Sequence, residues 1–420
     1  MIDAIRNALR IPDLRKKILF TLGIIALYRV GAHIPVPGVD PASMKDLVSG
    51  AGSALGLLNL FAGGALENFA IFALGIMPYI TSTIIMQLLQ AVIPTLERWS
   101  KEGEAGQRKI TQTARYMTLG IAFMESLGLL TVFQAPAASG GLGVNFDLLT
   151  EVVIVISLIS GTAAIMWMGE LITQRGIGNG MSLLIFASIV SRFPQTVVAS
   201  FRVNPWFMML VLVISLLVVA AVVFMEGGQR RIPVQYAKRV VGRRVYGGMG
   251  TYIPLKVNGA NVIPIIFASS VLLFPTTIAR FFTNVLWLQQ AAAWLSSGWS
   301  YIILFASLIV FFAYFYTALV FNPIETADNL RKNGGFIPGV RPGNPTAQYI
   351  TNVLNRITLP GAVFLAMIAV VPQAIFQQTG DQLVAAFGGT SILIMVGVAL
   401  ETMRQLESQL QMRHYDGFFK

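Results

Sequence analysis

The chain has 420 residues, of which 55% are hydrophobic and 12% are charged, and its net charge is +11. Because an average soluble domain has about 25% charged residues, this composition excludes an ordinary soluble protein and indicates a membrane protein. The chain has no cysteine, which excludes disulfides and thiolate metal sites, and two separate histidines, His33 and His414, cannot form an imidazole metal site alone.

Apolar windows close to the roughly 20 residues that cross a bilayer recur along the whole chain. They lack the alternation of outer-membrane barrel strands, and backbone groups in lipid must be paired within their own segment, so we expect helices. The windows predict ten transmembrane helices, at residues 18–35, 69–93, 116–135, 152–171, 178–199, 207–225, 262–282, 302–321, 357–376 and 383–402.

The N-terminal segment Met1–Lys17 is polar and basic, and no small-residue cleavage site follows it. We therefore expect no cleavable signal peptide, and residues 1–17 form a cytoplasmic N-terminal segment. Ahead of the second window, residues 57–69 begin like a helix that Gly63 and Gly64 interrupt and Glu67 follows. This short piece is not long enough to span a bilayer.

The basic residues indicate the topology of the chain. They gather in four segments, 6–17, 98–115, 230–256 and 331–356, which alternate with poorly basic connections. The positive-inside rule places these four segments, and with an even number of spans both termini, in the cytoplasm. Arg192 and Arg202 lie on the outer side, against this rule.

The windows divide five and five, which is compatible with an inverted repeat, although no internal sequence identity supports it. We predict an N-terminal half at 18–200, a C-terminal half at 201–402 and a cytoplasmic tail at 403–420. The C-terminal half has two long cytoplasmic loops, at about 226–261 and 322–356. Both are much longer than the roughly two to six residues that a connection needs, which favours a function for them.

The two loops differ in their patterns. Residues 231–236 and 244–255 alternate and are separated by a basic turn, which predicts a cytoplasmic hairpin. Its basic residues set topology, dock an acidic protein or RNA, or do both. The second loop has a helical middle and then a run of Gly and Pro around Arg341, which predicts an irregular tip. On the outer side, the Trp-rich segment 286–299 is typical of a membrane interface.

Ionisable residues are scarce inside the windows, where proton relays and ion sites would need them. Glu125 is the only acidic residue well inside a span, and we expect it to face other helices with a hydrogen-bond partner. No HExxH or GxSxG motif lies in the spans, so an intramembrane enzyme has no visible catalyst. A secondary transporter that uses the broken second segment as its site remains the alternative, disfavoured by the missing charges and the large loops.

Six stretches form an ordered set along the chain: FALGIMPYITSTIIMQLL (Phe72–Leu89), KEGEAGQRKI (Lys101–Ile110), ITQRGIGNGMSLLIFASIV (Ile172–Val190), GQRRIPVQYAKR (Gly228–Arg239), FYTALVFNPIETADNLRKNGGFIPGVRPG (Phe315–Gly343) and FGGTSILI (Phe387–Ile394). This set closely resembles the bacterial SecY family of protein translocase subunits. The resemblance runs from the second span to the tenth and includes both long loops. Glu125 departs from it, because an uncharged polar residue is expected there.

The resemblance implies an all-α polytopic membrane protein with ten transmembrane helices in two pseudo-symmetric halves and a short re-entrant plug helix. Such a protein is the central subunit of a protein-conducting channel. It translocates unfolded secretory polypeptides across the cytoplasmic (inner) membrane and releases transmembrane segments laterally into lipid. No catalytic residue, cofactor or metal is expected. The implied partners are SecE and SecG in the membrane, SecA ATPase and the ribosome at the cytoplasmic loops, signal sequences, nascent polypeptides and membrane lipids.

The same resemblance assigns roles to individual residues. The plug at about 57–69 includes Leu57, Leu60, Phe61, Gly63, Gly64 and Leu66. The pore ring consists of Ile80, Ile84, Ile185, Ile189, Ile266 and Ile394. From their spacing alone, the pairs four residues apart would be ordinary packing or lipid-facing residues. Gln87 and Asn261 are expected at the lateral gate, with interhelical hydrogen bonding as the rival role. Arg243, Arg244 and Arg341 are expected to dock SecA or the ribosome.

Overall fold

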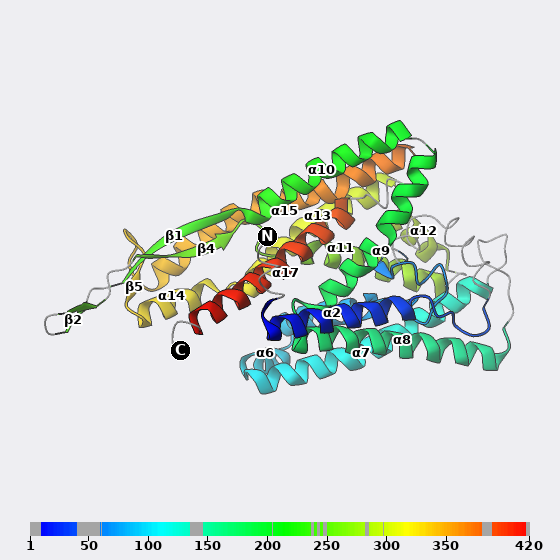
Figure 1. The fold of residues 1–420 in the computed structure, drawn as a ribbon, viewed down its shortest axis with the longest axis horizontal. Coiled ribbons are helices and arrows are strands. Elements are labelled where there is room, and N and C mark those ends of the chain that lie inside the picture. The colour runs from blue at the N-terminus through cyan, green and yellow to red at the C-terminus, as the bar shows by residue number, and fades with distance from the viewer. Residues whose placement is uncertain are drawn as a thin grey trace. The chain divides into compact units, whose positions relative to one another are not determined.

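The computed structural model describes residues 10–39, 59, 61–134, 146–203, 205–236, 239–241, 244–246, 250–281, 285–296, 298–379 and 389–416. Each of the predicted windows overlaps one α-helix, and several of these helices extend beyond their window (Figure 1). These helices are α2 (Pro12–Gly31), α5 (Met77–Val92), α7 (Glu104–Gln134), α8 (Leu148–Arg175), α9 (Gly180–Val203), α10 (Pro205–Gly227), α11 (Ile263–Phe281), α13 (Gly298–Val320), α15 (Asn344–Thr379) and α17 (Gly389–Asp416).

Within the described residues, four helices are individually long and apolar enough to cross a membrane, namely α8, α10, α13 with its continuation, and α15. A fifth candidate is α5 joined to α6 (Pro94–Lys101), with a bend of 100° between them. The fold is therefore that of a helical, multi-pass membrane protein. The number of ten spans remains a prediction that the ten helices support.

The chain forms two compact units, each described by itself. The first contains residues 1–209, 269–301 and 398–420, and the second contains residues 210–268 and 302–397. The interfacial segment predicted at 286–299 contains the helix α12 (Leu286–Ser296) of the first unit. The predicted boundary between halves at residue 200 stays a prediction.

Helices α5, α7, α8 and α9 form the main body of the first unit, with α2 against α8 and α9. The contact between α8 and α9 depends on glycine, because a Cβ atom at Gly180 would lie 1.9 Å from the carbonyl oxygen of Gly169. Small residues let helices in a membrane approach closely, which increases van der Waals contact between them. Arg115 of α7 and Glu170 of α8 form a bidentate ion pair, with Nε to Oε1 at 2.7 Å and Nη2 to Oε2 at 2.6 Å.

The predicted cytoplasmic hairpin is present in the second unit. Strand β1 (Gln229–Tyr236) pairs antiparallel with β4 (Thr251–Lys256), in a register that places Gln229 opposite Lys256. The second predicted strand, 244–255, is not continuous: β3 (Arg244–Tyr246) pairs with β2 (Arg239–Val241), and β4 begins at Thr251. Alternation along β1 buries Ile232 and Val234 while their neighbours stay exposed. This is the pattern of a strand with one covered face.

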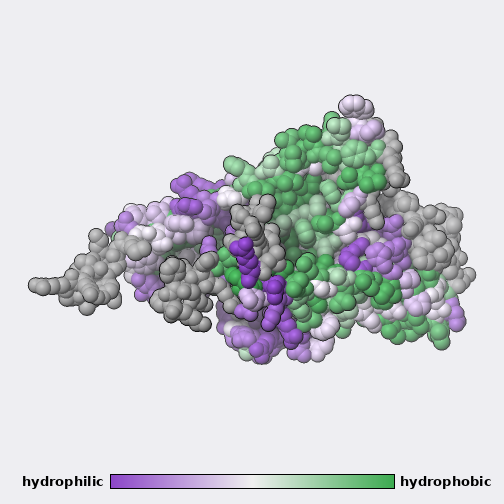
Figure 2. Space-filling model, in the orientation of Figure 1, coloured by the Kyte–Doolittle hydropathy of each residue, from purple (hydrophilic) through white to green (hydrophobic). Residues whose placement is uncertain are grey.

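The second long loop adds a strand to this sheet. Its helical middle is α14 (Pro323–Lys332), whose N-cap Asn322 accepts hydrogen bonds from the backbone of Ile324 and Glu325. Strand β5 (Gly335–Phe336) then pairs with the end of β1, which gives the sheet order β4-β1-β5. Isoleucine and leucine side chains of α15 cover the sheet, so both loops share one hydrophobic core. Figure 2 shows hydrophobic side chains over α10 and hydrophilic ones over this sheet.

Candidate functional site

The broken segment before α5 is compact and mostly non-helical. Asn59 and Phe61 have helical geometry, but the residues that follow, up to residue 76, form turns and one bridge at Ala70, so the predicted helix over 57–69 is wrong beyond Phe61. The reason is the backbone at Gly63 and Gly64, whose φ angles are +64° and +88°. A right-handed helix requires negative φ. Leu57 and Leu60 of the predicted plug lie outside the described residues. We call residues 61–76 the turn segment.

The side chains of the turn segment are anchored in the core of the first unit. Phe61, Leu66 and Phe69 are buried. Leu66 and Phe69 pack in a cluster with apolar side chains of α7 and α8, and the Phe69 ring meets the Phe133 ring edge-on at 4.8 Å between centroids. Such aromatic pairs contribute about 0.5–1.5 kcal/mol beyond the burial of their area.

Backbone hydrogen bonds join the turn segment to the residues after α2. The N–H of Val36 donates to the carbonyl of Phe69 at 2.9 Å, and the N–H of Ile71 donates to the carbonyl of Ile34 at 2.9 Å. Pro35 and Ala70 form an antiparallel bridge between these two bonds. The C-terminal part of the turn segment is therefore tied to the first unit by both packing and hydrogen bonds.

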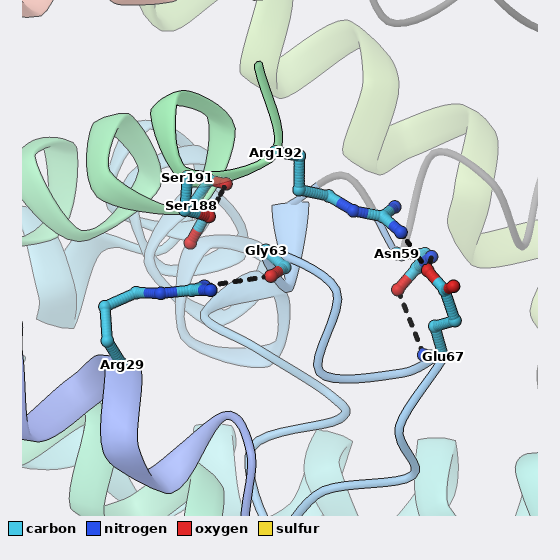
Figure 3. A network of polar contacts seen from close by, with 7 residues as sticks. All are labelled: Arg29, Asn59, Gly63, Glu67, Ser188, Ser191 and Arg192. Atoms are coloured by element: carbon cyan, nitrogen blue, oxygen red, sulfur yellow. Dashed lines mark hydrogen bonds and ion pairs between the residues drawn. The ribbon is translucent and has the colours of Figure 1, made fainter. Parts of the chain in front are cut away.

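The N-terminal part of the turn segment lies against α2 and α9 through polar contacts (Figure 3). Arg29 of α2 donates from Nη1 to the carbonyl of Gly63 at 2.9 Å. Arg192 of α9 forms an ion pair with Glu67. The backbone N–H of Glu67 donates to Oδ1 of Asn59 at 3.1 Å, and Nδ2 of Asn59 donates to Oε2 of Glu67 at 3.4 Å.

Gly63 is needed at a close approach to α9. A Cβ atom there would lie 2.9 Å from Cα of Ser188 and 3.1 Å from Nη1 of Arg29. Ser188 is itself held by the Tyr28 hydroxyl, with 2.6 Å between their oxygens. From the sequence, the two glycines were expected to interrupt a helix, and in the structure they permit a tight turn at a crowded contact.

The residues predicted for the pore ring are all buried. Ile80 and Ile84 lie on α5 and Ile185 and Ile189 on α9, all in the first unit. Ile266 of α11 and Ile394 of α17 belong to the second unit. Burial agrees with packing as well as with a constriction, so their grouping as a ring remains a prediction.

The two predicted gate residues differ in their surroundings. Gln87 of α5 is half-buried, and its Oε1 atom is buried without a hydrogen-bond partner in the described part of the chain. Asn261 has a φ of +52°, and its carbonyl accepts a 3.1 Å hydrogen bond from Nδ2 of Asn258. An unpaired buried amide oxygen costs about 1–3 kcal/mol, so Gln87 destabilises the arrangement that contains it.

Of the predicted docking residues, Arg341 is exposed in the irregular stretch after β5, and its carbonyl accepts a 2.8 Å hydrogen bond from Oγ1 of Thr346. Arg244 begins β3 and pairs in register with Val241, and Arg243 lies outside the described residues. Exposed Arg230 and Arg231 lie on β1 of the three-stranded sheet, which is separate from the two-stranded sheet of β2 and β3. Arg231 stacks over the Tyr252 ring at 4.7 Å. The three-stranded sheet therefore presents the exposed guanidinium groups of Arg230 and Arg231.

Comparisons with known proteins agree in one family. The SecY family model matches residues 70–403. The chain is 51% identical to the protein translocase subunit SecY of Streptomyces coelicolor, over the full length of both chains. The chain belongs to the SecY family.

Solved structures share the fold of this SecY chain at low sequence identity. One, of a SecY channel whose plug domain is described as stabilising the closed state and maintaining a membrane seal, gives a TM-score of 0.66 at 17% identity over 94% of this chain and 92% of that one. Another, of Sec61 in the canine ribosome-channel complex, gives a TM-score of 0.63 at 16% identity over 94% and 92% of the two chains.

Two polar contacts were not predicted from the sequence. Arg192 was only an exception to the positive-inside rule, and the structure pairs that charge with Glu67. The other contact is the buried pair of Glu226 and Asn258, whose Oε1 and Nδ2 atoms are 2.6 Å apart. Glu125 was expected to have a hydrogen-bond partner, but among the described residues its half-buried carboxyl group has none. For the pair of Arg192 with Glu67, the one available signal in the sequence was the arginine itself, because the positive-inside rule disfavours it on the outer side.

Proposed function

We propose that this chain is the pore-forming subunit of a protein-conducting channel in the cytoplasmic membrane, with both termini in the cytoplasm. Unfolded secretory polypeptides pass through it, and transmembrane segments leave it sideways into lipid. The observation that carries this proposal is the turn segment. It interrupts the helical structure within an apolar region, folds back and packs against α7, α8 and α9. Full-length similarity to SecY supports it.

In this proposal the turn segment is the plug. Its backbone makes turns instead of a full helix, and its N-terminal part contacts α2 and α9 through few side chains. A movable element needs some attachments that open easily, and the partly exposed ion pair of Arg192 with Glu67 is such an attachment. The description of a plug in a SecY structure of similar fold supports this assignment.

The pore ring would consist of the six isoleucines. Branched apolar side chains at a constriction exclude ions by dewetting, yet they can rearrange around a passing peptide. Gln87 and Asn261 would lie at the lateral gate, where an unsatisfied polar atom such as Oε1 of Gln87 makes dry packing less stable. This would make a gate easier to open.

We assign no catalytic step to this chain, so the energy for translocation comes from partners. The expected partners are SecE and SecG in the membrane and SecA or a translating ribosome at the cytoplasmic sheet. The exposed guanidinium groups of Arg231 and Arg341 suit carboxylates of a protein and phosphates of RNA equally. The fold shared with a ribosome-bound Sec61 channel supports the ribosome as a partner.

Site-specific crosslinking tests the proposed function. A secretory chain stalled in the channel would be probed with photoreactive residues at Ile84, Ile189 and Ile394, and at Leu216, which is 70% exposed on α10. We expect crosslinks at the three isoleucines and none at Leu216. If the engaged chain crosslinks at none of the three isoleucines, the isoleucines are packing residues and the polypeptide path is wrong.

A further inference from the structure

We propose that Arg192 and Arg29 are positioning residues that latch the N-terminal part of the turn segment, and that the ion pair of Arg192 with Glu67 is the contact that opens first. We call these contacts the latch. The inference rests on the proposed function, because it concerns how the plug is held. It also explains why α9 has an arginine on the outer side, where the positive-inside rule disfavours it.

The two arginines hold different kinds of group. Arg29 binds the carbonyl of Gly63. This acceptor belongs to the backbone, so its position is set by the conformation of the turn. Arg192 binds the carboxylate of Glu67, and its Nε atom lies 3.3 Å from where a Cβ atom of Gly64 would be. The guanidinium of Arg192 therefore covers the glycine turn and reaches the carboxylate beyond it, which a bulkier residue at Gly64 would obstruct.

Asn59 completes the latch from within the chain. Its side chain is 2% exposed and bonds both the backbone N–H and the carboxylate of Glu67. Its own carbonyl accepts the N–H of Gly64 at 2.9 Å. These bonds close residues 59–67 into a ring that presents Glu67 to α9. The carboxylate is therefore preorganised, and its pairing costs little side-chain entropy.

The Glu67 contact is suited to release because it is partly solvated. The side chains of Arg192 and Glu67 are 27% and 32% exposed. Ion pairs of this kind contribute modestly and are screened by salt. By contrast, Leu66 and Phe69 are buried in the core cluster. Opening should therefore begin at the latch and leave the C-terminal part of the turn segment in place.

Hydrogen exchange of the full-length chain with its membrane partners tests the latch directly. The probes are backbone N–H groups of the N-terminal part of the turn segment, among them those of Gly64 and Asn68, which bond the carbonyls of Asn59 and Gly64. We expect Glu67→Gln and Arg192→Gln each to speed exchange there about fivefold. Raising the salt concentration from 0.05 M to 1 M should speed exchange in the wild type and not in either variant.

A charge swap and a matched control separate the latch from general destabilisation. The double variant Glu67→Arg with Arg192→Glu should recover at least half of the lost protection, and Arg192→Lys should recover part of it. Glu170→Gln, which breaks the ion pair with Arg115 elsewhere in the first unit, should leave exchange in the turn segment unchanged. Unchanged exchange in both single variants, or equal effects from Glu170→Gln, would overturn the proposal.

Ion conductance in planar bilayers distinguishes failure of the latch from failure of the plug. Faster exchange together with increased leakage supports both. Faster exchange with wild-type conductance supports the latch and contradicts a sealing role for the turn segment. Exchange at the wild-type rate in both single variants contradicts the latch, whatever the conductance. The plug assignment is then tested by deleting residues 57–69.

Discussion

Asn258 donates a hydrogen bond from Nδ2 to Oε1 of Glu226 at 2.6 Å, and both side chains are buried. Glu226 lies at the end of α10 and Asn258 follows β4, so this contact closes the base of the hairpin formed by β1 and β4. The same Nδ2 atom donates to the carbonyl of Asn261, which precedes α11. The Asn258 amide therefore connects the hairpin, which is predicted to dock partners, to the start of a helix predicted to form the gate.

Asn258→Ala should destabilise the second unit by about 1.5–3 kcal/mol, because it removes a hydrogen bond to a buried charged group. Thermal unfolding of the purified protein in detergent measures the effect. Asn352→Ala, at an exposed position of α15, is the control and should change stability by less than about 0.5 kcal/mol. Equal unfolding temperatures for the two variants would mean that the buried pair contributes nothing.

Deleting residues 57–69 should increase ion leakage through purified channels in planar bilayers. The deletion removes Leu66 and Phe69 from the core cluster and breaks every contact of the latch. Translocation of a secretory protein into vesicles is measured in parallel, to show that the channel still assembles. Conductance at the wild-type level in active channels would contradict the plug assignment.

Gly63→Ala should release the turn segment. An L residue at a φ of +64° costs about 1–2 kcal/mol, and the added Cβ atom would lie 2.9 Å from Cα of Ser188, a backbone atom that cannot move freely. Hydrogen exchange in residues 61–76 should therefore become faster. The control is Gly120→Ala on α7, where a Cβ atom meets no other atom within 4 Å and should stabilise the helix by about 0.5–1 kcal/mol.

Gln87→Leu should raise the unfolding temperature, because it removes a buried oxygen that has no hydrogen-bond partner among the described residues. The expected gain is about 1–3 kcal/mol. If α5 forms one side of a gate, the same variant should also slow the release of transmembrane segments into lipid. Gln90→Leu, at a half-buried position of the same helix, is the comparison and should change both quantities less.

Charge reversal at Arg243, Arg244 or Arg341 should reduce SecA-driven translocation several-fold while the channel still inserts into the membrane. The side chain of Arg341 is exposed, so its replacement removes no packing. Translocation into inverted membrane vesicles measures the first effect and the amount of chain in the membrane measures the second. Wild-type translocation would show that these arginines serve topology alone.

The positions of the helices could be predicted from the sequence because long apolar windows in lipid have one stable backbone arrangement. The hairpin could be predicted for a similar reason, since the alternation around Ile232 and Val234 reflects one covered face. The family could be recognised from motifs such as GIMPYITSTII, because each motif is one continuous stretch of sequence and needs no tertiary structure to be read.

Tertiary structure alone decided how the broken segment folds. Glycine permits both a weak helix and a left-handed turn, so the choice at Gly63 depended on the nearby backbone of Ser188 and the guanidinium of Arg29. The partners of Glu67 and Glu226 were likewise invisible, because 125 residues separate Glu67 from Arg192 and 32 separate Glu226 from Asn258. A charge in the sequence indicates the need for a partner, and only the folded chain determines which residue lies within reach.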